Sequence, residues 1–211
     1  MTSFGVTLAL IVKIHVVLVV GQNSLTEERS LELIRANQRL YSNQLGTSLK
    51  LTRVQKKRNP YVSDTTIEGH VQLRLLERWE GFFRRRRGRT DTLQIALIPP
   101  LETGGHFYLA GYANGICSLN RFVGVAYATA EETNIYGQLR FKHSIIALAH
   151  EIGHLGGMTH DDTLTNDGKA GIMHSYALPF VDLQKKMRFS PKSRREWLDC
   201  VGSNTLSTGG R

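Results

Sequence analysis

The fold of this chain is decided by the stretch His150-Glu151-Ile152-Gly153-His154-Leu155-Gly156-Gly157-Met158-Thr159-His160-Asp161. It begins with H-E-x-x-H and fits the longer pattern H-E-x-x-H-x-x-G-x-x-H. Residues four apart lie on one face of an α-helix, so His150 and His154 can present two imidazoles to a single metal ion. Gly157 allows a sharp turn out of the helix, because glycine tolerates positive φ, and His160 can then return as a third ligand.

The donor set of this motif predicts a catalytic zinc site. Three histidine ligands leave the fourth position of a tetrahedral zinc ion open for water. Glu151 lies about 100° round the helix from His150, so its carboxylate can reach a water molecule beside the metal. The alternative is a chance match, but the apolar helix expected from Ser144 to Leu155 gives the motif a suitable context.

With these residues the sequence resembles the metzincin metalloproteases, and among them the adamalysin (reprolysin) group. Asp161, which follows the third histidine, is similar to the aspartate of that group. Gly171-Ile172-Met173-His174 resembles the methionine turn beneath the metal, with Met173 as its methionine. The segment from Phe189-Ser190-Pro191 to Cys200 resembles the family's C-terminal helix.

The resemblance, which is strong from about Leu93 to Cys200, implies an α/β (α+β) fold. We expect a mixed twisted sheet of the metzincin type with an active-site helix and a small C-terminal subdomain. The catalytic domain should span residues 22–201, with an upper part to about residue 156 and a lower part over 157–201, before a loose tail over 202–211. The 211 residues are enough for one such domain with its own core.

The resemblance also implies a substrate cleft. Phe122 to Ala128 is typical of a strand and is similar to the family's edge strand, which borders the cleft. An extended peptide would pair with that strand through backbone hydrogen bonds. We therefore expect substrate contacts at four residues: Val123, Gly124, Val125 and Ala126.

The sequence contains two cysteines, Cys117 and Cys200, which can form one disulfide in a secreted chain or remain two reduced core thiols. The adamalysin resemblance favours the bridge, because that group ties the segment before its edge strand to its C-terminal helix. The bridge would close a loop of more than 80 residues. Loop-closure entropy would then stabilise the fold by about 4 kcal/mol.

Residues 1–21 allow two interpretations. The run from Phe4 to Gly21 is almost wholly apolar but is interrupted by Lys13 and His15. It is either a secretory signal peptide, cut before Gln22, or a buried first strand of the catalytic domain. We favour the strand because of the interruption, and Lys13 near the centre argues against a membrane span.

Elsewhere the sequence predicts alternating helices and strands. The capping box Ser24-Leu25-Thr26-Glu27 should begin a helix that runs to about Tyr41, and a strand should follow around Leu49 to Leu51. The remaining elements are a helix over 66–83, a strand over 93–97, a glycine-rich loop over 101–112 and a helix from Ser190-Pro191 to about Cys200.

The chain carries a formal net charge of +9, from 27 Lys and Arg against 18 Asp and Glu, which favours acidic partners. No nucleic-acid-binding module is recognisable, so we expect no nucleic-acid partner. The four residues Arg84, Arg85, Arg86 and Arg87 close the helix predicted over 66–83. They form either a solvated helix end or a site for acidic glycans or acidic proteins.

These features predict a secreted, monomeric zinc endopeptidase that hydrolyses peptide bonds with metal-activated water and Glu151 as general base. With few disulfides and a single domain, the chain resembles metalloproteases of arthropod venoms and saliva. This resemblance implies a toxin role. Some adamalysins bind structural calcium, but Asp91 and Asn204 match that site poorly, and calcium is left open. The alternative is a catalytically weak zinc-holding domain whose basic surface binds a receptor, glycan or membrane. The intact Glu151 argues against it, because a structural site needs no such carboxylate.

Overall fold

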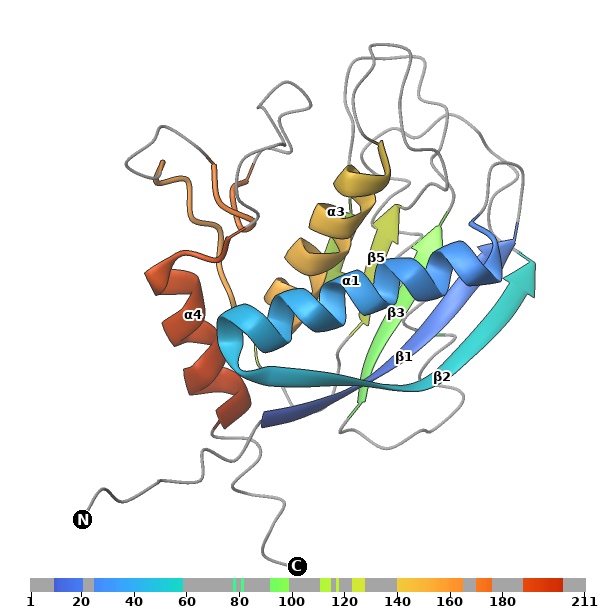
Figure 1. The fold of residues 1–211 in the computed structure, drawn as a ribbon, viewed down its shortest axis with the longest axis horizontal. Helices are drawn as coiled ribbons and strands as arrows, with labels where there is room; N and C mark the ends of the chain where they lie inside the picture. Colours follow the sequence, from blue (N-terminus) through green and yellow to red (C-terminus); the bar gives the residue numbers. More distant parts are fainter. Residues whose placement is uncertain are drawn as a thin grey trace, which may run out of the picture.

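The computed structural model describes residues 10–20, 25–58, 78, 81, 92–98, 111–114, 117, 123–127, 140–164, 170–175 and 188–202. Within them, a five-stranded mixed sheet carries two long helices on one face (Figure 1). The strands are β1 Leu10–Val20, β2 Thr47–Arg58, β3 Thr92–Ile98, β4 Gly111–Asn114 and β5 Val123–Tyr127. The helices are α1 Glu27–Leu45, α3 Arg140–Leu155, α4 Pro191–Trp197 and the π-helix η1 Leu198–Gly202. The predicted α/β class with a mixed sheet and an active-site helix is confirmed.

β1 lies inside the sheet, whose strand order is β2-β1-β3-β5-β4, and it is parallel to both of its neighbours. Successive residues of a strand face opposite sides of the sheet. Val16 and Val17 are both 0% exposed, so both faces of β1 are covered. A strand buried on both faces has a nearly continuous apolar sequence, which is why this segment also resembles a signal peptide. The structure has a strand at Leu10–Val20, and the boundaries expected for the catalytic domain stay predictions.

Among the described strands, β4 and not β5 is the outermost at this side of the sheet, which corrects the expectation from the sequence. β5 pairs in parallel with β3 on one side and antiparallel with β4 on the other. Both backbone edges of the expected contact residues are therefore already paired, and no substrate strand can add to them: Val123, Gly124, Val125 and Ala126. The sequence predicted a loop over 101–112, because a strand of only four residues that starts at Gly111 shows no measurable periodicity.

α1 begins at Glu27, with Thr26 as its N-cap, two residues after the cap expected at Ser24. The hydroxyl of Thr26 accepts a hydrogen bond from the backbone N–H of Arg29 at 3.1 Å. Glu27 and Glu28 occupy the first turn, where the helix dipole favours negative charge. The helix runs four residues beyond the predicted end at Tyr41, to Leu45.

The C-terminal subdomain is anchored on the last turns of α1 through aromatic side chains. Tyr41 lies 4.9 Å from Trp197 of α4 and 5.1 Å from Phe189, measured between ring centroids. The indole N–H of Trp197 donates to Thr47 Oγ1 at 2.9 Å, and the hydroxyl of Tyr41 donates to the carbonyl of Ala149 in α3 at 2.7 Å. α1 therefore connects α4 to the middle of the active-site helix (Figure 1).

Several predictions fall on residues that the structure does not describe. Only Arg78 and Gly81 of the helix predicted over 66–83 are described, and both are helical. The cluster Arg84, Arg85, Arg86 and Arg87, the tail after Gly202, and Asp91 and Asn204 all lie outside the described residues. None of the helices in the described ranges is long and apolar enough to cross a membrane.

Candidate metal centre

The three histidines of the motif converge on one point. His150 and His154 lie on α3, and His160 lies five residues beyond the end of that helix. The Nε2 atom of His154 is 2.9 Å from Nε2 of His150 and 3.1 Å from Nε2 of His160. A zinc ion at about 2.0–2.1 Å from each donor would hold such nitrogens about 3.3 Å apart. The three rings therefore offer three nitrogen donors that can reach one metal ion, and the convergence expected of His150, His154 and His160 is present.

Two backbone carbonyls orient the helical imidazoles. Nδ1 of His150 donates to the carbonyl of Ile172 at 2.8 Å, and Nδ1 of His154 donates to the carbonyl of Met158 at 2.8 Å. A carbonyl oxygen can only accept, so the proton of each neutral ring must be on Nδ1. Each Nε2 then carries a lone pair that points toward the other rings. Without a cation these lone pairs would repel one another, so the donor set fits a bound metal ion.

Burial keeps the helical histidines neutral. It lowers the pKa of His150 to about 4, against which the hydrogen bond to Ile172 acts only in part. Burial also lowers the pKa of His154. A proton therefore competes weakly with a metal ion for these two nitrogens at neutral pH.

The turn after α3 brings His160 back toward the helix. Gly157 has φ +89°, and two hydrogen bonds close a Schellman motif around it. These bonds run from the N–H of Gly157 to the carbonyl of His154 at 3.0 Å and from the N–H of Met158 to the carbonyl of Gly153 at 2.9 Å. The role expected for Gly157 thus has a clear geometric basis in the backbone.

Glu151 is buried beneath the edge of the sheet. Its side chain is 3% exposed, and its Oε2 has no hydrogen-bond partner among the described residues. A Cβ added at Gly111 of β4 would lie 2.6 Å from its Oε1, so the carboxylate occupies the space that this glycine leaves open. Burial raises the pKa of the Glu151 carboxyl. A buried carboxyl with an unpartnered oxygen and a raised pKa, on the residue that follows His150, is a candidate proton acceptor.

The segment expected to be a methionine turn packs under α3. Met173 is 1% exposed, and a Cβ added at Gly153 would lie 2.6 Å from its sulfur. Gly153 lies between Glu151 and His154, so Met173 supports the helix between these two residues. The neighbouring Ile172 supplies the carbonyl that orients His150.

Asp161 joins the third histidine to the C-terminal subdomain. Its Oδ2 accepts from the hydroxyl of Ser190 at 2.5 Å, and its Oδ1 accepts from the N–H of Thr163 at 3.2 Å. These bonds, that of Ser190 first, lower the pKa of the Asp161 carboxyl. The backbone N–H of Asp161 donates to the carbonyl of Met173 at 2.8 Å. Asp161 is therefore bonded to the methionine turn and to the N-cap of α4.

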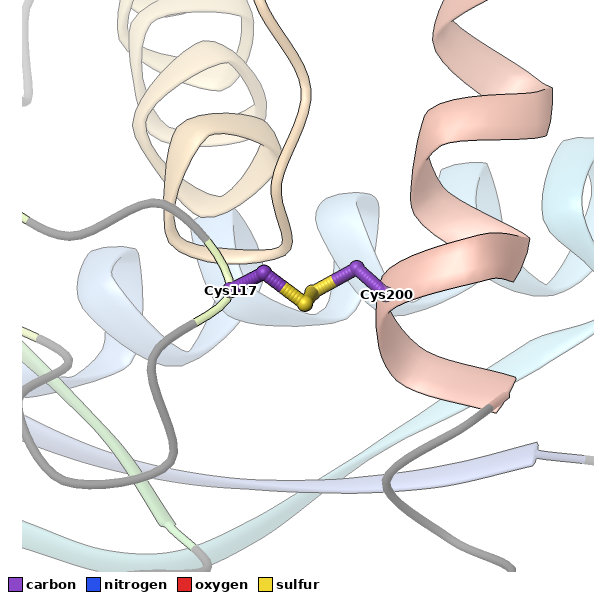
Figure 2. The surroundings of a disulfide bond; sticks show 2 residues. All are labelled: Cys117 and Cys200. Carbon is purple, nitrogen blue, oxygen red and sulfur yellow. A yellow bond between two sulfur atoms is a disulfide. The ribbon is translucent and has the colours of Figure 1, made fainter.

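Cys117 and Cys200 form a disulfide with a Cα–Cα distance of 5.4 Å. Figure 2 shows that it joins the segment after β4 to the C-terminal helical region, next to the turn that ends α3. A Cβ added at Gly157 would lie 2.9 Å from Cβ of Cys200 and 3.4 Å from Cβ of Cys117. The bridge implied by the family resemblance therefore packs directly against the turn of the metal motif.

Two glycines that shape this site could not be recognised from the sequence. Gly111 provides room for Glu151, and Gly156 packs against the indole of Trp197. Their partners lie about 40 residues away in the chain, so no local spacing could reveal these contacts. A glycine within a predicted loop, as at Gly111, is uninformative without the strand that it belongs to.

Comparison with solved structures identifies the architecture. Metalloproteinase-II from Bacteroides fragilis superposes with a TM-score of 0.59 at 18% sequence identity, over 93% of this chain and 55% of that one. The chain therefore spans about half the length of that protein. Archaemetzincin from Methanopyrus kandleri superposes with a TM-score of 0.58 at 16% identity, over 95% of this chain and 99% of that one. This chain has a metalloprotease fold.

The metalloprotease fold is identified from structure alone. No protein-family model matches the sequence, and no curated protein matches it either. At these identities the comparisons support the fold but do not single out the adamalysin group within it.

Proposed function

We propose that the protein is a zinc-dependent endopeptidase. The observation that carries the proposal is the convergence of three imidazole Nε2 atoms at the helix that also carries Glu151, whose buried Oε2 has no hydrogen-bond partner among the described residues. A structural zinc site is closed by four protein ligands, whereas a catalytic one keeps a position open. Three histidines without a fourth ligand among the described residues match the catalytic kind.

His150, His154 and His160 would hold the zinc ion. Zinc, when bound, supplies Lewis acidity that polarises a peptide carbonyl and acidifies water. Glu151 accepts a proton from the attacking water at its carboxylate and later delivers it to the departing amine. Its burial suits this role, because burial raises the pKa of the carboxyl and so makes it a stronger proton acceptor than an exposed carboxyl.

The outer edge of β4, which pairs with no other described strand, supports the proposal of an extended peptide substrate. β4 pairs with β5 on one side, and no described strand lies on its other side. An exposed strand edge can hold a peptide through backbone hydrogen bonds. Gly111 of β4 contacts the Glu151 side chain, so a peptide on this edge would pass close to the proposed general base. Substrate binding at β4 replaces the expectation for Val123–Ala126.

We also propose that the protein is an adamalysin-like, secreted metalloprotease, and the observations support these points unequally. Asp161 and the Cys117–Cys200 bridge support an adamalysin-like chain, and the disulfide supports secretion, since such bonds persist in oxidising compartments. A toxin role rests on the resemblance in sequence alone. Calcium, a glycan site at Arg84–Arg87 and the monomeric state stay predictions from the sequence.

The test compares the wild type with Glu151→Gln and His154→Ala. The purified wild type should cleave unfolded casein, lose activity in 1,10-phenanthroline and regain it with added zinc. Glu151→Gln should bind one zinc per chain but lose at least about 100-fold in turnover. His154→Ala should lose both zinc binding and peptidase activity. Zinc binding by a wild type that cleaves no protein would instead favour the non-enzymatic zinc-holding domain.

A further inference from the structure

Two side chains of α4 hold the backbone that carries the third histidine. The carboxylate of Glu196 accepts from the N–H of Thr159 at 2.9 Å and from its hydroxyl at 2.7 Å. The ammonium group of Lys192 donates to the carbonyl of His160 at 2.8 Å. Lys192 and Glu196 lie one helical turn apart and 3.8 Å from each other, so one face of α4 binds two consecutive residues.

His160 needs such support more than the other two histidines do. His150 and His154 are fixed by α3 and by carbonyls that accept from their Nδ1 atoms. No described carbonyl or carboxylate accepts from the ring of His160, whose one ring hydrogen-bond contact in the described part is with His154. His160 is also exposed and lies outside any helix or strand. The position of its Nε2 therefore depends on how firmly its backbone is held.

We propose that Glu196 and Lys192 are positioning residues that hold His160 in place for metal binding. Glu196 immobilises Thr159 through two bonds, and Lys192 immobilises the next peptide group. Because α4 is anchored on α1 through Trp197, this support is connected to the core of the protein. Outer groups that orient metal ligands typically contribute about 10–100-fold to metal affinity.

The inference rests on the proposed zinc site, and its test has readouts besides peptidase activity. Zinc affinity is measured by competition with a chromophoric chelator, and ligand geometry by the visible absorption of the Co²⁺-loaded protein. The variants are Glu196→Ala, Lys192→Met and Thr159→Val. The last removes the hydroxyl that donates to Glu196 but keeps the backbone N–H that donates to the same carboxylate. The matched controls are Glu28→Gln, in the exposed first turn of α1, and Arg195→Met, on the exposed face of α4.

Glu196→Ala should weaken zinc binding by about 10–100-fold and change the intensity of the Co²⁺ bands. Lys192→Met and Thr159→Val should have smaller effects in the same direction, and the controls should bind as the wild type does. Glu196→Ala combined with Thr159→Val should lose less than the product of the two single effects, because both remove one shared bond.

One outcome would overturn the positioning role but keep the zinc site. In that outcome Glu196→Ala and Thr159→Val bind zinc within twofold of the wild type, whereas His160→Ala loses zinc. If Glu196→Ala does not fold, the zinc affinities of Thr159→Val and Lys192→Met decide instead. Affinities within twofold of the wild type in both would overturn the positioning role. A wild type that binds no zinc would overturn the proposed function, and this inference with it.

Discussion

Gly111 on β4 lies directly against the side chain of Glu151 on α3. A Cβ added at Gly111 would lie 2.5 Å from Cγ and 2.6 Å from Oε1 of Glu151, which is too close for both to keep their positions. The relationship joins the sheet edge proposed for substrate binding to the carboxylate proposed as general base. The size of the side chain at position 111 thus controls where the carboxylate of Glu151 lies.

Gly111→Ala should lower kcat/KM for a peptide substrate by about 10–100-fold, because it displaces a catalytic group by a fraction of an ångström or more. Zinc affinity should stay within twofold of the wild type, since no ligand contacts Gly111. Gly81→Ala is the control, because a Cβ there meets nothing within 4 Å. Unchanged kcat/KM in Gly111→Ala would show that Glu151 tolerates displacement or is not the base.

Gly157→Ala should lower both the zinc affinity and the free energy of unfolding. Alanine at φ +89° costs about 1–2 kcal/mol, and its Cβ would also lie 2.9 Å from Cys200 Cβ, which pushes the turn before His160 out of place. Gly46→Ala separates the two effects, because Gly46 has φ +61° with nothing within 4 Å of its Cβ position. Both variants should lose unfolding free energy in urea titrations. Equal zinc affinities for the two would contradict the role given to the turn.

Replacing both cysteines by alanine should lower the free energy of unfolding by about 2–5 kcal/mol, the usual cost of losing a disulfide that closes a long loop. The bridge closes a separation of 83 residues. The free energy of unfolding is measured by urea titration of the metal-free double variant. It is compared with that of the metal-free wild type, both with and without dithiothreitol. Reduced wild type and the double variant should agree, and a difference of less than about 1 kcal/mol from the oxidised protein would show that the bridge is dispensable.

His143 on α3 should make the protein less stable on mild acidification. Burial lowers the pKa of His143 in the folded state below that of an exposed histidine. The unfolded chain therefore takes up a proton first, so the contribution of His143 is present above about pH 6.5 and is lost as the pH falls through its lowered folded value. The unfolding free energy of the wild type should fall more between pH 7.5 and pH 5 than that of His143→Gln. Parallel pH profiles would contradict this prediction.

The three candidate metal ligands could be recognised from the sequence because their arrangement is local. His150 and His154 lie one turn apart on a single helix, and Gly157 and His160 follow within six residues, so the helical repeat and one glycine turn are enough to place them. The strands and helices around them were also predictable from periodicity and caps, as at Ser190-Pro191. For the same reason β1 could be recognised as a buried strand, although its two covered faces made it resemble a signal peptide.

Contacts between distant residues were decided only by the tertiary structure. Strand order depends on which backbone edges remain unpaired, and the four residues of β4 carry no periodic signal, so β5 was wrongly expected at the edge. The room for Glu151 at Gly111 and the hold of Glu196 on Thr159 join residues 40 and 37 positions apart. Spacing along a chain encodes neighbours on one helix or strand, whereas the packing of separate elements determines which other groups surround each ligand. The sequence was therefore enough to recognise the three histidines and Glu151 as candidates, whereas the tertiary structure decided which groups orient the histidines and which strand lies outermost beside Glu151.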